Sequence, residues 1–338
     1  MPRDVTRVII IRCGALGDLV YATSVIDALK AQFGDDTIID FVTTPGPGAL
    51  FKNDPRINTV FPLKHKKVPI ILSSQKKAIV NHSKNIPYDI LINFEMGKQF
   101  KSLVNTIQAQ QKVGFLVQDL EIPNEAIHMV DITKHVFKAL VNSTIFENSF
   151  PKLIGSDVAE VLQKYNLPQK YLIISPSNSH QKRNILNYRA WENDSWRELI
   201  ELLSAKIPLI IIGNKNEDTF FEKLKPYPKN VIDLVAKTSL VDLIGVIEAA
   251  SGLIATDTGT AHIASAVNTE VFALIGPTPA DVTGPYQSKY NKVHIISSNL
   301  DCSPCYKTEA MKNCNDNICM KQITANQVYD SVVLANLL

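Results

Sequence analysis

The sequence predicts an α/β protein made of two doubly wound domains, each built on a parallel sheet. Short apolar runs, such as residues 8–11 and 172–175, alternate with segments that repeat apolar residues at helical spacing. This alternation is typical of parallel strands joined by helices. A chain of 338 residues with 45% hydrophobic content is long enough for two buried cores. Because the pattern starts again after a polar stretch near Asn148, we expect domains over residues 1–150 and 151–338.

The overall composition narrows the class of protein. Lys and Arg number 35 against 33 Asp and Glu, a net charge of +2, so the chain as a whole has no field that would favour nucleic acid. No apolar run reaches the roughly 18 residues needed to cross a bilayer. Five cysteines are too few for a secreted fold framed by disulfides. We therefore expect a cytoplasmic protein without a signal peptide.

The elements of the first domain follow in order. The run 8–11 predicts a buried strand, and the helix after it carries apolar residues from Ala22 to Phe33 on one face and ends at Gly34. The remaining elements are strands over 37–42, 89–93 and 111–115 and a helix over 128–140.

One carboxylate, Asp18, follows the first strand, where open α/β sheets place their ligands. It fits a catalytic position and a helix N-cap about equally well. Gly14 and Gly17 lack the G-x-G-x-x-G spacing of a dinucleotide fingerprint, so a nicotinamide cofactor is not favoured.

A lysine-rich segment lies between the strands expected over 37–42 and 89–93. Its lysines are interleaved with the apolar run 68–72, a mixture that suits an anionic glycolipid or a lipid surface, although most charge runs are only solvated faces. The candidate acceptor-binding residues are Lys64, Lys66, Lys67, Lys76 and Lys77.

The second domain repeats the alternation and contains the motif around which the chain is organised. Its strands are expected over 172–175, 209–213, 231–233, 253–256, 271–275 and 293–296. After the fourth of them, Asp257-Thr-Gly259 opens a helix, and the free amides and positive dipole of such a helix end form a cradle for a phosphate. An ordinary capped helix is the alternative.

Two polar residues elsewhere in this domain complement the cradle. Arg189, which follows the first strand and its polar loop, offers bidentate hydrogen bonds to a diphosphate. Glu217 follows the second strand and suits ribose hydroxyls or, equally, a charge in the first turn of a helix.

The C-terminal segment contains four cysteines with the spacing C-x2-C-x8-C-x4-C. Four thiols at such a spacing predict a structural zinc site, and unligated thiols are the alternative. The cysteines are Cys302, Cys305, Cys314 and Cys319.

Five motifs, in this order, resemble those of glycosyltransferase family 9, the heptosyltransferases. They lie at residues 14–18, 189–191, 237–240, 257–262 and 276–278. The resemblance implies a GT-B architecture, in which two Rossmann-like domains face a central cleft, the first binding the acceptor and the second the donor. It also implies an ADP-heptose donor, an inner-core lipopolysaccharide acceptor and inversion at the anomeric carbon. Such an acceptor implies a peripheral contact with the cytoplasmic face of the inner membrane.

The resemblance also assigns roles to single residues. Asp18 matches the family's catalytic base. Arg189 stands where the family usually has Lys, beside the diphosphate, and Glu217 and Thr238 fall where the family contacts the nucleoside. The donor-binding block comprises Asp257, Thr258, Gly259, Thr260 and His262.

The chemistry of an inverting transfer agrees with these residues. A carboxylate takes the proton of the acceptor hydroxyl, and a cation with a helix end stabilises the leaving diphosphate. The chain has no Asp-x-Asp pair, so no metal or other cofactor is expected in catalysis. Two other functions stay open: a nucleotide-sugar epimerase of the same architecture, and a non-catalytic protein that binds a sugar nucleotide or glycolipid.

Overall fold

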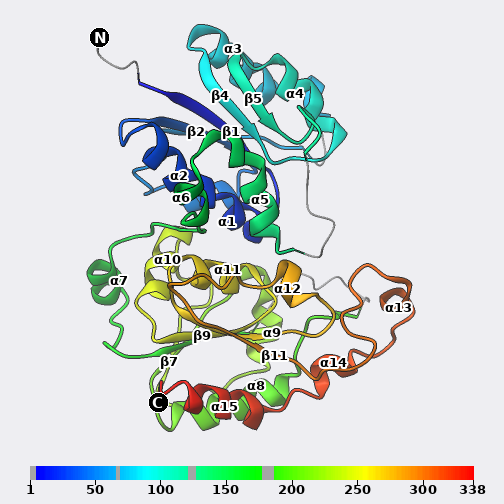
Figure 1. Ribbon diagram of the computed structural model, residues 1–338. Coiled ribbons are helices and arrows are strands. Elements are labelled where there is room, and N and C mark those ends of the chain that lie inside the picture. The colour runs from blue at the N-terminus through cyan, green and yellow to red at the C-terminus, as the bar shows by residue number, and fades with distance from the viewer. Residues whose placement is uncertain (1–4, 66–68, 121–126, 177–185) are drawn as a thin grey trace. The chain divides into compact units, whose positions relative to one another are not determined.

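The chain folds into two units, each with one parallel sheet (Figure 1). The computed structural model describes residues 5–65, 69–120, 127–176 and 186–338. Unit 1 comprises Met1–Ile154 and unit 2 comprises Gly155–Leu338, so the division falls a few residues beyond the expected boundary after residue 150. The predicted class, α/β with two parallel sheets, is confirmed.

Unit 1 has a five-stranded sheet in the order β3-β2-β1-β4-β5. The side chains of β1 are buried from Val8 onward, because this central strand is covered on both faces. The sequence did not predict β3, whose four residues are half-buried or exposed and lack the apolar run of an inner strand. The strands are β1 (Arg7–Ile11), β2 (Ile38–Thr43), β3 (Thr59–Pro62), β4 (Tyr88–Asn93) and β5 (Ala109–Gly114).

Helices cover both faces of this sheet. α1, α2, α5 and α6 pack together on one face, and α3 and α4 pack together on the other (Figure 1). The strand order reverses between β1 and β4, and ligands of such sheets bind at the carboxyl ends of the two strands that flank this point. The helices are α1 (Leu16–Ala22), α2 (Ser24–Phe33), α3 (Ser74–Asn85), α4 (Lys101–Thr106), α5 (Met129–Phe137) and α6 (Ser143–Glu147), with 3-10 turns η1 (Pro47–Phe51), η2 (Ile70–Leu72), η3 (Lys98–Phe100) and η4 (Lys138–Leu140).

The first helix, predicted as one piece, is interrupted at Thr23. Its hydroxyl donates to the carbonyl oxygen of Val20 at 2.6 Å, and the hydroxyl of Ser24 donates to that of Tyr21 at 2.9 Å. Hydroxyl groups that return to the preceding turn compete with the helical ladder and bend it. α2 ends, as predicted, at Gly34, whose φ of 112° is in the left-handed region.

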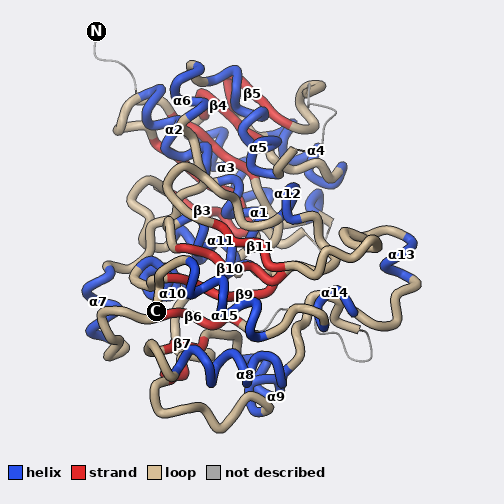
Figure 2. The backbone as a smooth tube through the Cα atoms, turned by 60° about the horizontal axis from the view of Figure 1, so that its bottom comes forward, coloured by secondary structure: helices blue, strands red, loops and turns tan. Residues whose placement is uncertain are grey.

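Unit 2 has a six-stranded sheet in the order β11-β10-β9-β6-β7-β8, and its recorded pairings are all parallel. Each of the six strands expected between residues 172 and 296 is confirmed, with small shifts at the ends. The strands appear in red in Figure 2 and are β6 (Leu172–Ser175), β7 (Leu209–Ile211), β8 (Val231–Asp233), β9 (Gly252–Thr256), β10 (Glu270–Leu274) and β11 (Val293–Ile296).

The helices of unit 2 also form two layers. α10 and α11 lie on one side of the sheet, and α8 and α15 lie on the other (Figure 1). The strand order reverses between β6 and β9, which marks the expected ligand-binding position of this unit. The helices are α7 (Val158–Lys164), α8 (Asn193–Ser204), α9 (Asp218–Glu222), α10 (Leu240–Glu248), α11 (Gly259–Ala266), α12 (Ala280–Thr283), α13 (Glu309–Lys312), α14 (Ile318–Lys321) and α15 (Ala325–Leu334), with the 3-10 turn η5 (Lys215–Glu217).

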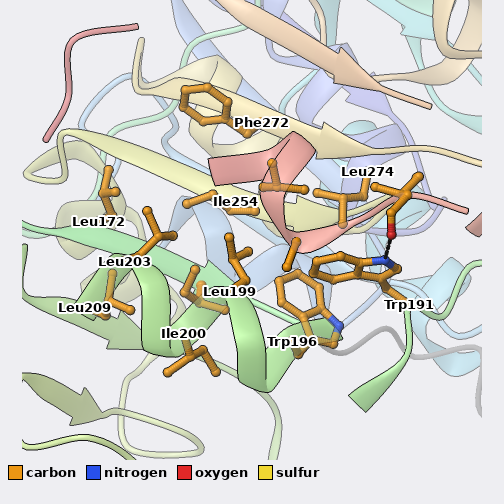
Figure 3. Close-up of a cluster of buried hydrophobic side chains, with 14 of the residues drawn as sticks. Leu172, Trp191, Trp196, Leu199, Ile200, Leu203, Leu209, Ile254, Phe272 and Leu274 are labelled. Atoms are coloured by element: carbon orange, nitrogen blue, oxygen red, sulfur yellow. Dashed lines mark hydrogen bonds between the residues drawn. The ribbon is translucent and has the colours of Figure 1, made fainter. Parts of the chain in front are cut away.

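Two tryptophans anchor the segment that enters α8. Trp191 and Trp196 are buried with their rings edge to face, and the centroids are 4.7 Å apart. The indole N–H of Trp191 donates to the carbonyl oxygen of Ile323 at 2.8 Å (Figure 3). A buried indole N–H usually has such a partner. The two rings therefore hold residues 187–192 against the core and against the C-terminal segment.

Candidate functional site

Asp18 lies at the reversal point of unit 1, in the first turn of α1, the helix that follows β1. Its Oδ1 accepts from Nη2 of Arg12 at 2.7 Å, and its Oδ2 accepts from the backbone N–H of Ala15 at 2.8 Å. Asp18 is thus not the N-cap of α1 but a first-turn residue whose carboxylate reaches back to the N-cap amide. The side chain stays 36% exposed, so the carboxylate is both fixed in orientation and reachable by a substrate.

Arg12 and Glu95, which the sequence analysis did not single out, complete this cluster. Glu95 follows β4, and its Oε1 accepts from the backbone N–H of Cys13 at 2.7 Å. Nη1 of Arg12 donates to the carbonyl oxygen of Phe94 at 2.9 Å. The loops after β1 and β4 are therefore tied together at the reversal point. The only signal of these two residues in the sequence is a charge close behind each buried strand, Arg12 one residue after β1 and Glu95 two residues after β4.

Gly14 is required by this arrangement. A Cβ built at this position would lie 2.4 Å from the Cβ and Oδ2 of Asp18. No side chain larger than hydrogen fits there while Asp18 holds its contact with Ala15. The glycine of the 14–18 motif thus has a steric reason in the carboxylate that it adjoins.

The predicted phosphate cradle lies at the reversal point of unit 2. α11 begins at Gly259, and its N-cap Thr258 makes no side-chain hydrogen bond to the amides of the first turn. The hydroxyl of Thr260 instead contacts those of Thr258 at 2.7 Å and of Ser175, at the end of β6, at 2.8 Å. The amides of the first turn are therefore not capped by the Thr258 hydroxyl, and an anion is the natural partner for such a helix end.

Arg189 and Asp257, two of the predicted donor-binding residues, form an ion pair. Nη1 of Arg189 lies 3.1 Å from Oδ2 of Asp257, whose side chain is only 8% exposed. The guanidinium also stacks over the ring of Tyr306, 4.9 Å from its centroid. A guanidinium has five N–H donors in a planar fork, so one ion pair leaves donors for a diphosphate. Tyr306, which directly follows Cys305 inside the cysteine motif, was not predicted from the sequence.

Three buried oxygens at the same edge of the sheet have no hydrogen-bond partner among the described residues. They are Oε1 of Glu217, Oγ1 of Thr256 and Oγ1 of Thr278. Buried polar atoms are nearly always paired. A hydroxyl group of a ligand could donate to the Glu217 oxygen, and the threonine hydroxyls could donate to hydroxyl or phosphate oxygens. The other oxygen of Glu217 accepts from the backbone N–H of Asn214 at 3.1 Å, which orients the carboxylate.

The remaining predicted donor residues, Thr238 and His262, follow two different strands of the same sheet. Thr238 is half-buried in the turn between β8 and α10, at the outer edge of the sheet. His262 is buried within α11. Each of the sequence-predicted donor residues of unit 2 thus follows a carboxyl end of one of its strands, which is where parallel sheets bind nucleotides.

The C-terminal segment, residues 297–324 between β11 and α15, holds two motifs of unit 2 in place. The backbone N–H groups of Cys305 and Tyr306 donate to the carbonyl oxygen of Pro277, at 2.9 and 2.8 Å. The side-chain amide of Asn317 donates to the carbonyl oxygen of Ala190 at 2.8 Å. Figure 2 shows this segment as a mostly irregular path that carries only the short helices α13 and α14. It therefore contacts both the Gly-Pro-Thr turn and the segment that carries Arg189.

The four predicted zinc ligands lie in this segment. Burial, and then the charges of the Cys305, Cys302 and Cys314 thiols, raises the pKa of Cys319. A Cβ at Gly276 would lie 2.8 Å from Sγ of Cys319, which explains the glycine of that turn. The described residues include no group of three or more His, Cys, Asp or Glu side chains placed to hold a metal ion. The zinc site stays a prediction.

The lysine-rich segment of unit 1 is described in part. Lys64, Lys76 and Lys77 flank the beginning of α3, whereas Lys66 and Lys67 lie outside the described residues. Nζ of Lys76 donates to the hydroxyl of Ser102 on α4, so this lysine bridges two helices. Within the described ranges, no helix is both long and apolar enough to span a bilayer.

The comparisons with known proteins agree with this arrangement. The family description Glycosyltransferase family 9 (heptosyltransferase) matches residues 88–315. Lipopolysaccharide heptosyltransferase 3 of Escherichia coli is 24% identical over 288 residues, which cover 78% of this chain and 81% of that protein.

Solved structures share the fold over nearly the whole chain. The glycosyl transferase family 9 from Veillonella parvula DSM 2008 has a TM-score of 0.80 at 17% identity and covers 100% of this chain and 98% of that one. E. coli heptosyltransferase WaaC with ADP-2-deoxy-2-fluoro heptose has a TM-score of 0.67 at 19% identity and covers 98% of this chain and 100% of that one. The predicted GT-B fold class is thereby confirmed.

Proposed function

This chain belongs to glycosyltransferase family 9, the heptosyltransferase family, and from that premise we propose that it transfers a heptose from ADP-heptose to an inner-core lipopolysaccharide acceptor. Membership makes it a glycosyltransferase and links it to heptose transfer in lipopolysaccharide synthesis. The identity of the donor rests on the likeness to a heptosyltransferase solved with an ADP-heptose analogue. The observation that carries the proposal is the pair of Arg189 and Asp257 beside the uncapped end of α11.

The proposed reaction is a single displacement with inversion. A hydroxyl oxygen of the acceptor attacks the anomeric carbon, and the bond from that carbon to the diphosphate oxygen breaks. Asp18 takes the proton of the attacking hydroxyl. Arg189 and the amides of Thr258 to Thr260 stabilise the negative charge that develops on the leaving ADP. Without an Asp-x-Asp pair in the chain, these groups replace a catalytic metal, and we expect turnover without added divalent cation.

Unit 1 would bind the acceptor and unit 2 the donor. In unit 2, Glu217 is oriented by its bond to Asn214 and keeps one oxygen without a described partner, which suits a ribose hydroxyl. Thr238 lies one strand further along the sheet, where a nucleoside would extend from the diphosphate. In unit 1, the exposed part of Asp18 is the proposed point of contact with the acceptor hydroxyl.

The donor is tested by measuring which nucleotide sugar protects the purified protein against thermal unfolding. A ligand at one hundred times its dissociation constant stabilises the fold by about 2.7 kcal/mol. We expect ADP-heptose to raise the melting temperature more than UDP- or GDP-sugars. Product analysis with and without lipopolysaccharide then separates transfer from epimerisation. Conversion of the donor without an acceptor would contradict the proposal.

The lysine-rich segment is proposed to recruit the anionic acceptor at the membrane surface. Replacing Lys64, Lys66, Lys67, Lys76 and Lys77 by Ser is expected to raise the acceptor KM by at least about tenfold, since a lysine close to an anionic surface contributes up to about 1 kcal/mol and tenfold corresponds to about 1.4 kcal/mol. The salt dependence of KM should flatten as well, because exposed charges act over only about 8 Å at physiological ionic strength. Lys223→Ser with Lys229→Ser, which removes two exposed lysines of unit 2, is the control for a loss of surface charge elsewhere. A fall in donor affinity instead would show that the segment has another role.

The cysteine segment is proposed to hold structural zinc and so to fasten the C-terminal segment to unit 2. Four thiols are a donor set that zinc prefers. Elemental analysis of the purified protein is expected to find about one zinc per chain, and the Cys302→Ser variant should lose it. Because the segment contacts the Gly-Pro-Thr turn and Ala190, removal of zinc should also lower the melting temperature. Four freely titratable thiols in the native, metal-free protein would rule the site out.

A further inference from the structure

Unit 1 carries a surface in which exposed apolar side chains are surrounded by lysines. It is formed by η2, η3 and the beginnings of α3 and α4, which contact one another. Figure 1 shows α3 and α4 on one side of the unit 1 sheet. We call this set of residues the basic–apolar surface. Its members are Lys64, Ile71, Leu72, Lys77, Met96, Lys98 and Lys101, each of which is exposed.

The apolar part of this surface is held outward by the local fold. Ile70 is buried in the core of unit 1, whereas Ile71 and Leu72 are 67% and 77% exposed. In a 3-10 turn only every third residue returns to the same side, so burial of Ile70 turns its two followers away from the core. Ser73 caps α3 directly afterwards, which fixes this orientation. Met96, 57% exposed, adds a third apolar side chain.

The segment of the sequence that carries these side chains is rich in positive charge. From residue 64 to 101 the sequence contains eight lysines and two acidic residues, Asp89 and Glu95. Both carboxylates are occupied elsewhere: Asp89 accepts from the backbone N–H of Arg7 at 2.7 Å, and Glu95 accepts from that of Cys13 at 2.7 Å. The lysines of the surface are therefore not neutralised by nearby acids of the same segment, although the protein as a whole carries a net charge of only +2.

The surface lies at the same edge of the sheet as Asp18. η2 follows β3 and η3 follows β4, so both come after carboxyl ends of parallel strands, as Asp18 does. Met96 adjoins Glu95, whose carboxylate contacts the loop that leads from β1 to Asp18. An acceptor whose lipid stays in a membrane on this surface would have its sugar portion near the Asp18 loop.

We propose that the basic–apolar surface docks on an anionic phospholipid bilayer, with Ile71, Leu72 and Met96 entering the headgroup region and the lysines binding lipid phosphates. A mixture of buried apolar side chains and flanking cations is what interfacial membrane binding requires. Lys98, Lys101 and the three apolar residues are not among the residues that the proposed function assigns to the acceptor. The inference rests on the proposed function only for the lipid-linked acceptor that such docking would serve.

The test uses the full chain and vesicles that contain no lipopolysaccharide. Co-sedimentation with phosphatidylcholine vesicles is compared with that of vesicles containing phosphatidylglycerol. We expect binding only to the anionic vesicles and a loss of about tenfold or more for Ile71→Ser with Leu72→Ser, the effect of removing two partly buried aliphatic side chains. Lys98→Gln with Lys101→Gln should weaken binding and flatten its salt dependence.

The matched control is Val333→Ser with Leu334→Ser. These residues are also adjacent and exposed, at 43% and 82%, but lie at the end of α15 in unit 2, and their replacement should leave vesicle binding unchanged. Leu72→Trp provides a second readout that is independent of affinity. Its emission should shift to the blue on anionic vesicles and be quenched by brominated lipid, whereas that of Leu334→Trp should not.

The outcomes separate this inference from the proposed function. If the Ile71 and Leu72 variant binds anionic vesicles as well as the parent protein, or if the unit 2 control loses as much, the docking proposal is wrong. Binding that requires lipopolysaccharide in the vesicle would overturn it as well, in favour of glycolipid recognition alone. Turnover of a deacylated acceptor in solution is expected to be unchanged in the Ile71 and Leu72 variant. Absence of turnover in the parent protein would instead contradict the proposed function and leave the vesicle result standing.

Discussion

Replacing Asp18 by asparagine is expected to lower kcat by roughly 10² to 10⁴, the usual contribution of a general base, while donor affinity changes little. Asparagine has the size of aspartate but no basicity. One amide oxygen cannot serve both Arg12 and Ala15, which the two carboxylate oxygens contact at 2.7 and 2.8 Å. The variant should therefore also lose stability, by about 1 kcal/mol for the hydrogen bond that is given up. Turnover, donor calorimetry and thermal unfolding measured on one preparation separate the three effects.

Asp27→Asn is the matched control for that experiment. Asp27 lies on α2 of the same unit, is half-exposed, and its Oδ1 accepts from Nη1 of Arg56 at 2.8 Å. The change of a carboxylate to an amide and the loss of an arginine pair are thus the same, but the position is away from the reversal point of the sheet. We expect a similar loss of stability and full turnover. If Asp18→Asn also keeps full turnover, Asp18 only caps α1, and Glu95 becomes the next carboxylate to examine.

Replacing Arg189 by alanine is expected to weaken donor binding by roughly ten- to 150-fold, the range for hydrogen bonds to charged groups. The value of kcat should fall in the same variant, by about 10² to 10³, because the guanidinium would also stabilise charge on the leaving diphosphate. This joint loss differs from the effect of Asp18→Asn, which leaves the donor bound. Calorimetry with ADP and ADP-heptose, run beside turnover, measures both.

The ion pair with Asp257 gives Arg189→Ala a second effect on donor binding. Its removal leaves the carboxylate of Asp257, 8% exposed, without its cation, and that charge would itself repel a diphosphate. The double variant Arg189→Ala with Asp257→Asn removes both charges. If donor affinity returns to that of the parent protein, Arg189 acts only by neutralising Asp257. If the affinity stays low, the guanidinium contacts the diphosphate.

Two further variants complete this series. Arg189→Lys restores the charge, and the usual family residue, but not the planar fork, so we expect partial recovery of kcat. Arg197→Ala removes an exposed arginine of α8 that pairs with Asp194, and surface pairs of this kind contribute little. Loss of activity in Arg197→Ala would indicate a general effect on unit 2 rather than a local one at the diphosphate.

The sequence predicted the inner strands well because the burial of each position can be recognised from the residue that occupies it. β6 and β9 are buried throughout, so their positions are apolar except for a hydroxyl residue at the end of each, and the run stands out. β3 is half-exposed and was missed for the same physical reason. The break at Thr23 was missed because it depends on hydroxyl bonds to the preceding turn, which threonine makes in some helices and not in others.

Because the strands of each sheet are parallel, candidate residues could also be placed at one edge of the sheet from the sequence alone. Once a run is recognised as a strand of a parallel sheet, the residue that follows it must lie at the carboxyl edge. Asp18, Glu217 and Asp257 were located in this way, and each lies after a strand of its unit. The exposed positions of Ile71 and Leu72, by contrast, depend on how one 3-10 turn is anchored, which an apolar run cannot reveal.

What the sequence alone determined is therefore which side chains lie at the carboxyl edge of each sheet. Only the tertiary structure decided which of them contact one another. The loop before Asp18 meets Glu95 because β1 and β4 become neighbours, although 82 residues separate Cys13 from Glu95. Arg189 meets Asp257 because β6 and β9 become neighbours. The physical reason is that strand order follows from the burial of all strands and helices together, whereas an apolar run records only that its own residues are buried.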